Sequence, residues 1–211
     1  MKFFHLFLII FFSLYFSTNA RENYDCRKLS DIVEKKNNLP NKLLSSISLT
    51  ESGYLKNGIY APWPWTLNVN GKPKFFENKK EMTNFLNKKL SQNIKNIDIG
   101  CMQINYLYHS KNFNEIDDMI NPQLNVQYAG KFLKKLFKIH KSWNKAISFY
   151  HSSDPQRMKN YLKKVKKNWD MERQRKRFKD KSGNLSKAND STTKKILFFR
   201  EILNSEKHFN M

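Results

Sequence analysis

The sequence contains only two cysteines, Cys26 and Cys101, among its 211 residues. No set of histidines and cysteines has the spacing of metal ligands, so we predict no structural metal and no other cofactor. Two cysteines can form one disulfide within the chain, and two unpaired core thiols are the alternative. The sequence also lacks internal repeats of the solenoid kind.

Long apolar runs are absent after residue 20, so we predict no membrane-spanning helix in that part of the chain. The first twenty residues differ, with a basic start at Lys2, an apolar run from Phe3 to Phe16 and small residues at Thr18-Asn19-Ala20. This pattern predicts a secretory signal peptide that is cleaved after Ala20, and therefore an exported, periplasmic protein. An uncleaved N-terminal anchor is the alternative, although the run is shorter than the roughly 20 residues that a spanning helix needs.

Acidic residues are scarce. The 18 aspartates and glutamates face 39 lysines and arginines, which gives a formal net charge of +21. In a cytosolic protein this excess would suggest nucleic acid. For an exported chain we expect no nucleic acid and instead a polyanion of the cell wall, anionic lipid or lipopolysaccharide.

Helical periodicity dominates the remaining residues, and we predict a mainly α (α+β) domain over residues 21–170. One small β hairpin is expected near residues 63–76, where Asn70-Gly71 is a strong two-residue turn signal. Caps and apolar spacing predict helices over 26–36, 40–51, 80–93 and 100–108, from Pro122 onward, over 143–150 and over 155–169.

Residues 171–211 differ in composition from the domain. Residues 173–181 are dense in lysine and arginine, and residues 182–193 are polar. We predict a solvated basic tail with a possible amphipathic helix over 194–208. That helix would dock on the domain or rest on an anionic membrane surface, and the tail would contact the cell wall.

One carboxylate stands out in the helix of residues 40–51. Leu43, Ile47 and Glu51 are spaced four residues apart, so a helix places all three on one face. Burial against an apolar face raises the pKa of a carboxyl, and a general acid needs such a pKa near neutral pH. The alternative is a surface glutamate at the end of a helix.

Four features follow one another along the chain: Glu51-Ser52-Gly53, the aromatic hairpin, the segment Gly100-Cys101-Met102-Gln103-Ile104-Asn105 and the segment from Ala146 to Ser152. Their order resembles that in the lytic transglycosylases of the SLT type, which share the lysozyme-like fold. The resemblance covers about residues 26–165. It implies a peptidoglycan substrate, and a secretion or flagellar apparatus is an additional candidate partner.

The resemblance implies that Glu51 is the single catalytic residue. It would first protonate the glycosidic oxygen between N-acetylmuramic acid and N-acetylglucosamine. It would then take the proton of the muramic C6 hydroxyl as a 1,6-anhydro ring closes. Most glycosidases use two carboxylates, and Asp98 is the candidate for a second one. With Asp98 the expected activity would be hydrolysis, whereas a helix cap or surface residue is its structural alternative.

The resemblance also implies roles for further residues. Gln103 would hydrogen-bond the sugar, Met102 would pack in the wall of the cleft, and the Tyr150 hydroxyl would approach Glu51. His151 replaces the more usual asparagine, and either a sugar contact or a packed ring is expected there. Cys101 replaces the more common leucine, for which a bridge to Cys26 is our explanation. The complete expected substrate-binding set is Ser52, Met102, Gln103, Asn105, Tyr150 and His151.

Two other functions remain alternatives to the lytic transglycosylase. One is a muramidase that hydrolyses the same bond with water. The other is a non-catalytic protein that binds glycan or belongs to a secretion apparatus. Trp63 and Trp65 could stack on sugar rings, but aromatic residues of a hairpin are more often core.

Overall fold

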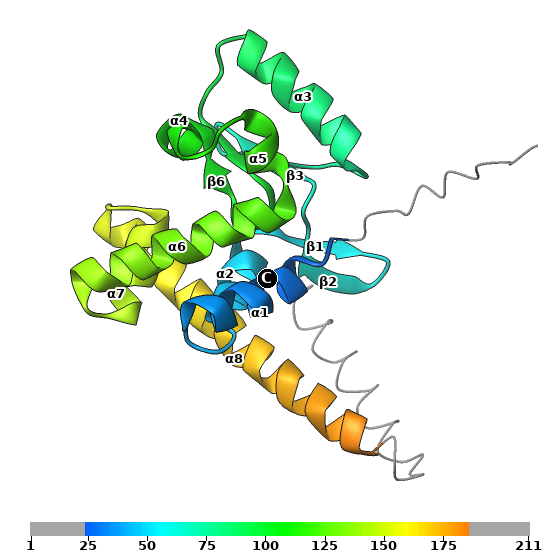
Figure 1. Ribbon diagram of the computed structural model, residues 1–211, viewed down its shortest axis with the longest axis vertical. Helices are drawn as coiled ribbons and strands as arrows, with labels where there is room; N and C mark the ends of the chain where they lie inside the picture. The colour runs from blue at the N-terminus through cyan, green and yellow to red at the C-terminus, as the bar shows by residue number, and fades with distance from the viewer. Residues whose placement is uncertain (1–23, 186–211) are drawn as a thin grey trace, which may run out of the picture.

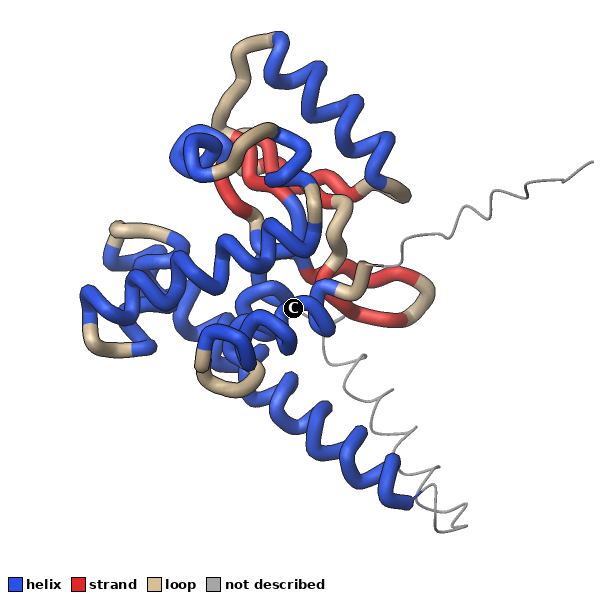
Figure 2. Tube along the Cα trace, viewed as in Figure 1, coloured by secondary structure: helices blue, strands red, loops and turns tan. Residues whose placement is uncertain are grey.

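The computed structural model describes residues 24–185 of the chain. The predicted signal peptide and the possible helix 194–208 lie outside these residues. Helices dominate the described chain and strands form a minor part, which confirms the mainly α prediction (Figure 2). No helix in the described region is long and apolar enough to cross a membrane. The helices are α1 (Cys26–Asn37), α2 (Leu43–Ser52), α3 (Lys79–Ser91), α4 (Tyr106–His109), α5 (Ile116–Ile120), α6 (Pro122–His140), α7 (Trp143–His151) and α8 (Pro155–Leu185), with 3-10 turns η1 (Gly100–Met102) and η2 (Ser110–Asn112).

Helix α2 is the centre of the helical half and is buried along nearly its whole length. Leu43, Leu44 and Ile47 are completely inaccessible to solvent. The helix packs against α1, α8 and η1. Its N-terminus is capped by Glu34 of α1, whose carboxylate accepts hydrogen bonds from the backbone N–H groups of Lys42 and Ser45. A buried carboxylate at this place satisfies donors that a helix leaves free in its first turn.

Two small antiparallel sheets follow α2. The first pairs β1 (Gly53–Lys56) with β2 (Ile59–Pro62), and the second has the order β4-β3-β5-β6. Its strands are β3 (Thr66–Val69), β4 (Lys72–Phe75), β5 (Ile97–Ile99) and β6 (Ile104–Asn105). The predicted hairpin at Asn70-Gly71 is confirmed, but the expectation of a single β element is wrong. The first hairpin also turns at an Asn-Gly pair, Asn57-Gly58, and all four turn residues have positive φ.

The molecule has two ends with α6 between them (Figure 1). Helices α3 and α4 lie with the larger sheet at one end, and α1, α2, α7 and α8 lie at the other. A disulfide between Cys26 and Cys101, with an S–S distance of 2.08 Å, joins the start of α1 to η1. It is the pair that the sequence suggested, and both residues are fully buried.

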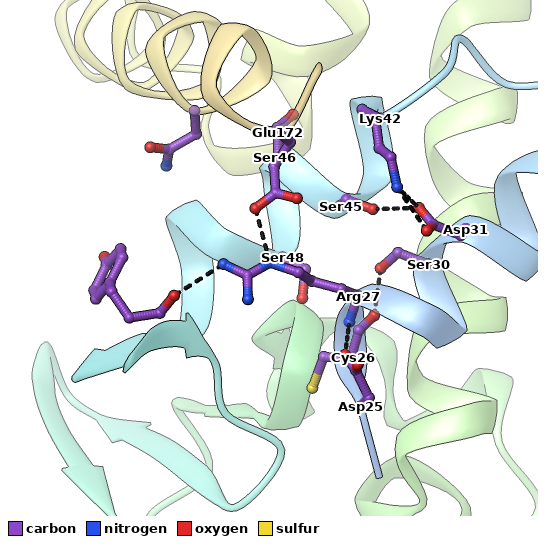
Figure 3. A network of polar contacts seen from close by, with 12 residues as sticks. Asp25, Cys26, Arg27, Ser30, Asp31, Lys42, Ser45, Ser46, Ser48 and Glu172 are labelled. Carbon is purple, nitrogen blue, oxygen red and sulfur yellow. Dashed lines mark hydrogen bonds and ion pairs between the residues drawn. The ribbon is translucent and has the colours of Figure 1, made fainter. Parts of the chain in front are cut away.

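Helix α8 crosses the boundary that we expected near residue 170 and continues to Leu185. Residues 171–185 are thus a continuation of this helix, and the boundary expected near residue 170 lies inside it. Arginine, lysine, glutamate and glutamine favour helix, so a dense charge run does not end one. Arg27 of α1 donates to buried Glu172 of α8 at 2.8 Å, as Figure 3 shows. This ion pair ties the two helices together beyond the predicted end of the domain.

Candidate active site

Glu51 lies in the last turn of α2, part-buried at the point where the helix passes into β1. The apolar residues one and two turns before it, Ile47 and Leu43, face the core. The hydroxyl of Tyr161, from α8, donates a hydrogen bond to Glu51 Oε1 at 2.5 Å. Tyr161 is only 5% exposed, so the hydroxyl that reaches Glu51 belongs to a ring held in the core. The other carboxyl oxygen is the one that remains for proton transfer.

The electrostatic surroundings hold Glu51 in its protonated form near neutral pH. Burial raises the pKa of Glu51 from its ordinary value of 4.5 to about 8. The hydrogen bond from Tyr161 and the charge of Lys164 act in the opposite direction, and the carboxylate of Asp98 adds to the increase. The pKa of Tyr161 is raised well above its ordinary value, mainly by burial, so this tyrosine remains a hydrogen-bond donor.

The turn η1 supplies the segment opposite the end of α2. Gly100 has φ +76, and a Cβ at this position would lie 3.2 Å from the side chain of Asn125. Gln103 follows in the left-handed region and its Nε2 donates to the carbonyl of Gly100 at 3.0 Å. The side chain is thereby oriented by its own backbone turn. Its carbonyl Oε1 is the atom that can accept a hydrogen bond from a ligand.

Asp98 lies on β5 between two asparagines. The register places Asp98 opposite Asn68 of β3 and opposite Asn105 of β6, so these three side chains share one face of the sheet. Asn105 Nδ2 donates to Asp98 Oδ1 at 2.8 Å and to Asn96 Oδ1 at 2.9 Å. Burial raises the pKa of Asp98, whereas the Asn105 hydrogen bond lowers it. The Oδ1 atoms of Asn68 and Asn105 are buried without a hydrogen-bond partner.

A family model described as Transglycosylase SLT domain matches residues 28–174, which is more than half of the chain. The chain belongs to the transglycosylase SLT family. This is a family of peptidoglycan lytic transglycosylases, so the substrate class is the glycan of peptidoglycan. Comparisons with curated proteins and with solved structures gave no match.

Tyr150 of this SLT domain occupies a different role from the one we expected. Its hydroxyl donates to the backbone carbonyl of Met102 at 3.0 Å, and Tyr161 makes the bond to Glu51. A phenol has one proton to donate, so Tyr150 cannot also donate to the carboxylate. Burial raises the pKa of Tyr150 well above its ordinary value, and the negative charge of Glu51 contributes to this. Tyr150 thus lies near Glu51 and supports η1, the turn that Gln103 follows.

Two residues of the expected substrate-binding set belong to the core of the SLT domain. Met102 is completely buried, and its N–H donates to Asn125 Oδ1 at 3.0 Å. Ser52 is 1% exposed, and its hydroxyl bonds the carbonyls of Ser48 and Cys101. Neither side chain has surface to offer a ligand. Ser52 joins α2 to η1, and the backbone N–H of Met102 joins η1 to α6.

His151, in contrast, is exposed and stacks on Tyr161. The two tryptophans of the expected hairpin differ from each other. Trp65 is 8% exposed and belongs to the core, whereas Trp63 is half-buried and donates its indole N–H to the carbonyl of Phe76. Among the described residues, no group of three or more histidine, cysteine, aspartate or glutamate side chains is arranged to hold a metal ion.

The residue that the sequence did not single out as functional is Tyr161. Its spacing with Met158, Leu162 and Val165 indicates a core position, and the ring is indeed buried. A buried tyrosine hydroxyl usually has a hydrogen-bond partner, so a tyrosine at a predicted core position was the signal in the sequence that pointed to a polar contact. Together the site holds one protonated carboxyl with a fixed neighbour on one oxygen, which is what proton transfer to a leaving group requires.

Proposed function

We propose that the protein is an exported lytic transglycosylase that cleaves the β-1,4 bond between N-acetylmuramic acid and N-acetylglucosamine. The observation that carries this proposal is Glu51, a buried carboxyl with a pKa of about 8 in a domain of the SLT family. At neutral pH such a group is protonated and can act as a general acid.

The reaction needs no second nucleophile from the protein. In the first step the proton of Glu51 moves to the glycosidic oxygen, and the bond from muramic C1 to that oxygen breaks. In the second step the muramic C6 hydroxyl attacks C1, and its proton returns to the Glu51 carboxylate. The product is a 1,6-anhydromuramic end, and no water is consumed. One residue therefore acts as acid and then as base.

The neighbours of Glu51 support both steps. The Tyr161 hydrogen bond favours the carboxylate that exists between the steps, because hydrogen bonds to the charged form stabilise it. Lys164 lowers the pKa of Glu51 in the same sense. Burial thus keeps Glu51 protonated in the free enzyme, while Tyr161 and Lys164 limit the rise of its pKa and so help it to release the proton.

Substrate contacts are proposed for Gln103, which follows η1, and for Asn105 of β6. Gln103 would accept a hydrogen bond from the sugar through Oε1. Asn105 has a buried Oδ1 without a partner, which a sugar hydroxyl or amide would satisfy. The Tyr150 hydroxyl donates to the carbonyl of Met102, and its proposed contribution is to stabilise η1 in this way.

Hydrolysis of the same bond is the second candidate, and Asp98 is the observation that favours it. Its carboxylate lies close enough to Glu51 to raise the pKa of the latter, and Asn105 orients it. A second carboxylate near the acid is what most glycosidases use to activate water or to stabilise the sugar cation. In the transglycosylase reaction Asp98 would instead stabilise the positive charge that develops at C1.

The cellular setting is part of the proposal. Export to the periplasm by the N-terminal signal would bring the enzyme to its peptidoglycan substrate. The basic residues after 170 would add attraction to the acidic wall or an anionic membrane, and a secretion or flagellar apparatus is a further candidate partner. Replacement of the lysines and arginines of residues 173–181 by glutamine, together with deletion of residues 186–211, tests the attraction; sacculus binding that keeps its strength and salt dependence would refute it.

The test of the catalytic assignment is release of soluble fragments from purified wall sacculi. Wild-type protein should release them, and Glu51→Gln should release fewer by at least about a hundredfold, since general acid catalysis contributes roughly 10²–10⁴ in rate. Glu51→Gln should still bind sacculi. Release by Glu51→Gln near the wild-type rate would remove Glu51 from the acid role, and binding without release by the wild type would favour a glycan-binding protein.

A further inference from the structure

His151 is the last residue of α7, and its imidazole lies flat on the ring of Tyr161. The two ring centroids are 4.4 Å apart and the rings are within 5° of parallel. Tyr161 lies ten residues later in the sequence, one turn and a half into α8. The stack therefore bridges the α7–α8 corner.

The hydrogen bond between Tyr161 and Glu51 depends on the position of this ring. The bond is short, at 2.5 Å, and joins residues that are 110 positions apart in the sequence. A phenol hydroxyl lies at the far end of a rigid ring, so a small rotation of the ring moves the oxygen by a large fraction of an ångström. The ring is 5% exposed and has His151 on one face.

The corner that carries His151 is itself held in place. The N–H of Asp154 donates to Ser152 Oγ at 3.0 Å, and the N–H of Arg157 donates to Asp154 Oδ1 at 2.8 Å. These bonds fix the short connection between the two helices and hence the position of His151 over Tyr161. His151 as a whole is exposed, so its role is not to fill the core.

We propose that His151 is a positioning residue for the general acid: its ring holds Tyr161 so that the tyrosine hydroxyl stays on Glu51 Oε1. The catalytic meaning of this contact rests on the proposed function, but the contact itself does not. The sequence left two functions open for His151, a sugar contact and a packed ring. Positioning of Tyr161 is a third.

The charges around the stack are consistent with a neutral imidazole. Burial lowers the pKa of His151 below its ordinary value of 6.5, and the cations Arg157 and Lys164 lower it further. The groups that act on Glu51 itself are Tyr161 and Lys164 of α8 and Asp98 of β5. At neutral pH the imidazole adds no charge to this set, so its effect on Glu51 passes through the position of Tyr161.

The decisive experiment titrates the side-chain carboxyl of Glu51 by ¹³C NMR in the substrate-free protein. Tyr161→Phe keeps the ring but removes the donor, so the pKa of Glu51 should rise. His151→Ala should raise it in the same direction and by no more than Tyr161→Phe does. In the double variant the His151 substitution should have no further effect, because the hydrogen bond through which it acts is already gone.

Two matched variants complete the design. His151→Phe retains a flat ring for the stack and should keep the pKa of Glu51 at its wild-type value. His140 stacks on Phe149 with the same face-to-face geometry, at 4.1 Å and 1°, so His140→Ala controls for loss of any such stack. His140→Ala should leave the pKa of Glu51 unchanged.

Activity on sacculi then separates the three roles of His151. Positioning predicts that His151→Ala lowers kcat by about tenfold with little change in KM, in the range found for residues that orient a catalytic group, and that His151→Phe restores it. A higher KM that phenylalanine does not restore would show a sugar contact.

An unchanged Glu51 titration, or an effect that persists in the Tyr161→Phe background, would overturn the proposal. Because the titration needs no substrate, wild-type protein that releases nothing would refute the proposed function and leave this test intact.

Discussion

The raised pKa of Glu51 predicts that this residue lowers the free energy of unfolding at neutral pH. A carboxyl whose pKa is about 8 in the folded protein and 4.5 when unfolded binds a proton more tightly in the folded state. Stability is therefore fully present below pH 4.5 and falls as the pH rises toward 8. At pH 7 the cost is about 3 kcal/mol, since each pKa unit corresponds to about 1.36 kcal/mol.

Substitution Glu51→Gln removes this cost while it keeps the shape of the side chain. Its Oε1 can still accept the hydrogen bond from Tyr161. We expect the variant to be more stable than the wild type by about 3 kcal/mol at pH 7, or roughly 6–12 °C in Tm for a domain of this size. At pH 4 the two proteins should be nearly equal. Thermal and urea unfolding between pH 4 and pH 8 measures both quantities.

Glu34 provides the matched control because burial raises its pKa as well, to about 7. Both of its oxygens accept backbone N–H groups, from Lys42 and Ser45. At pH 4 the Glu34 carboxyl is protonated, but its hydroxyl oxygen can still accept, whereas the NH2 group of an amide cannot. Glu34→Gln should therefore lose about 1–3 kcal/mol at pH 4, where Glu51→Gln is neutral. A gain for Glu51→Gln that does not change with pH, or no gain at pH 7, would refute the reasoning about Glu51.

Three further predictions follow from neighbouring contacts. Asp98→Asn should shift the alkaline limit of activity to lower pH, because loss of the carboxylate lowers the pKa of the general acid; a pH–rate profile checks this. Joint replacement of Cys26 and Cys101 by alanine should cost about 4 kcal/mol in urea unfolding, because the bridge closes a separation of 75 residues. Glu172→Ala should cost about 3 kcal/mol in the same assay, because it leaves the part-buried Arg27 guanidinium without its carboxylate.

Local signals predicted the fold well where the relevant interactions are local. Asn121 and Pro122 mark the start of α6, and the asparagine side chain caps it by accepting from Gln123 and Leu124. The Asn70-Gly71 turn was recognised, but Asn57-Gly58 was not, although the signal is the same. Strands β5 and β6 are three and two residues long, too short for a period-two pattern, and they exist through pairing of β5 with β3 and of β6 with β5.

The site was predictable only in part, for a related reason. The spacing of Leu43, Ile47 and Glu51 on one helix face is a property of nine consecutive residues, so the sequence alone suggests a buried carboxyl. The donor to that carboxyl comes from a residue 110 positions away. The choice between Tyr150 and Tyr161 depends on how α7 and α8 pack, and helix periodicity shows both simply as apolar positions.

The mass of the fragments released from sacculi tests the central claim most directly. Wild-type protein would be incubated with sacculi in water enriched in ¹⁸O, and the soluble muropeptides analysed by mass spectrometry. A lytic transglycosylase should release fragments that end in 1,6-anhydromuramic acid. These fragments should be one water lighter than the reducing forms and carry no ¹⁸O at the muramic end. Reducing ends that contain ¹⁸O would contradict it and assign the reaction to hydrolysis with Asp98 as the second carboxylate.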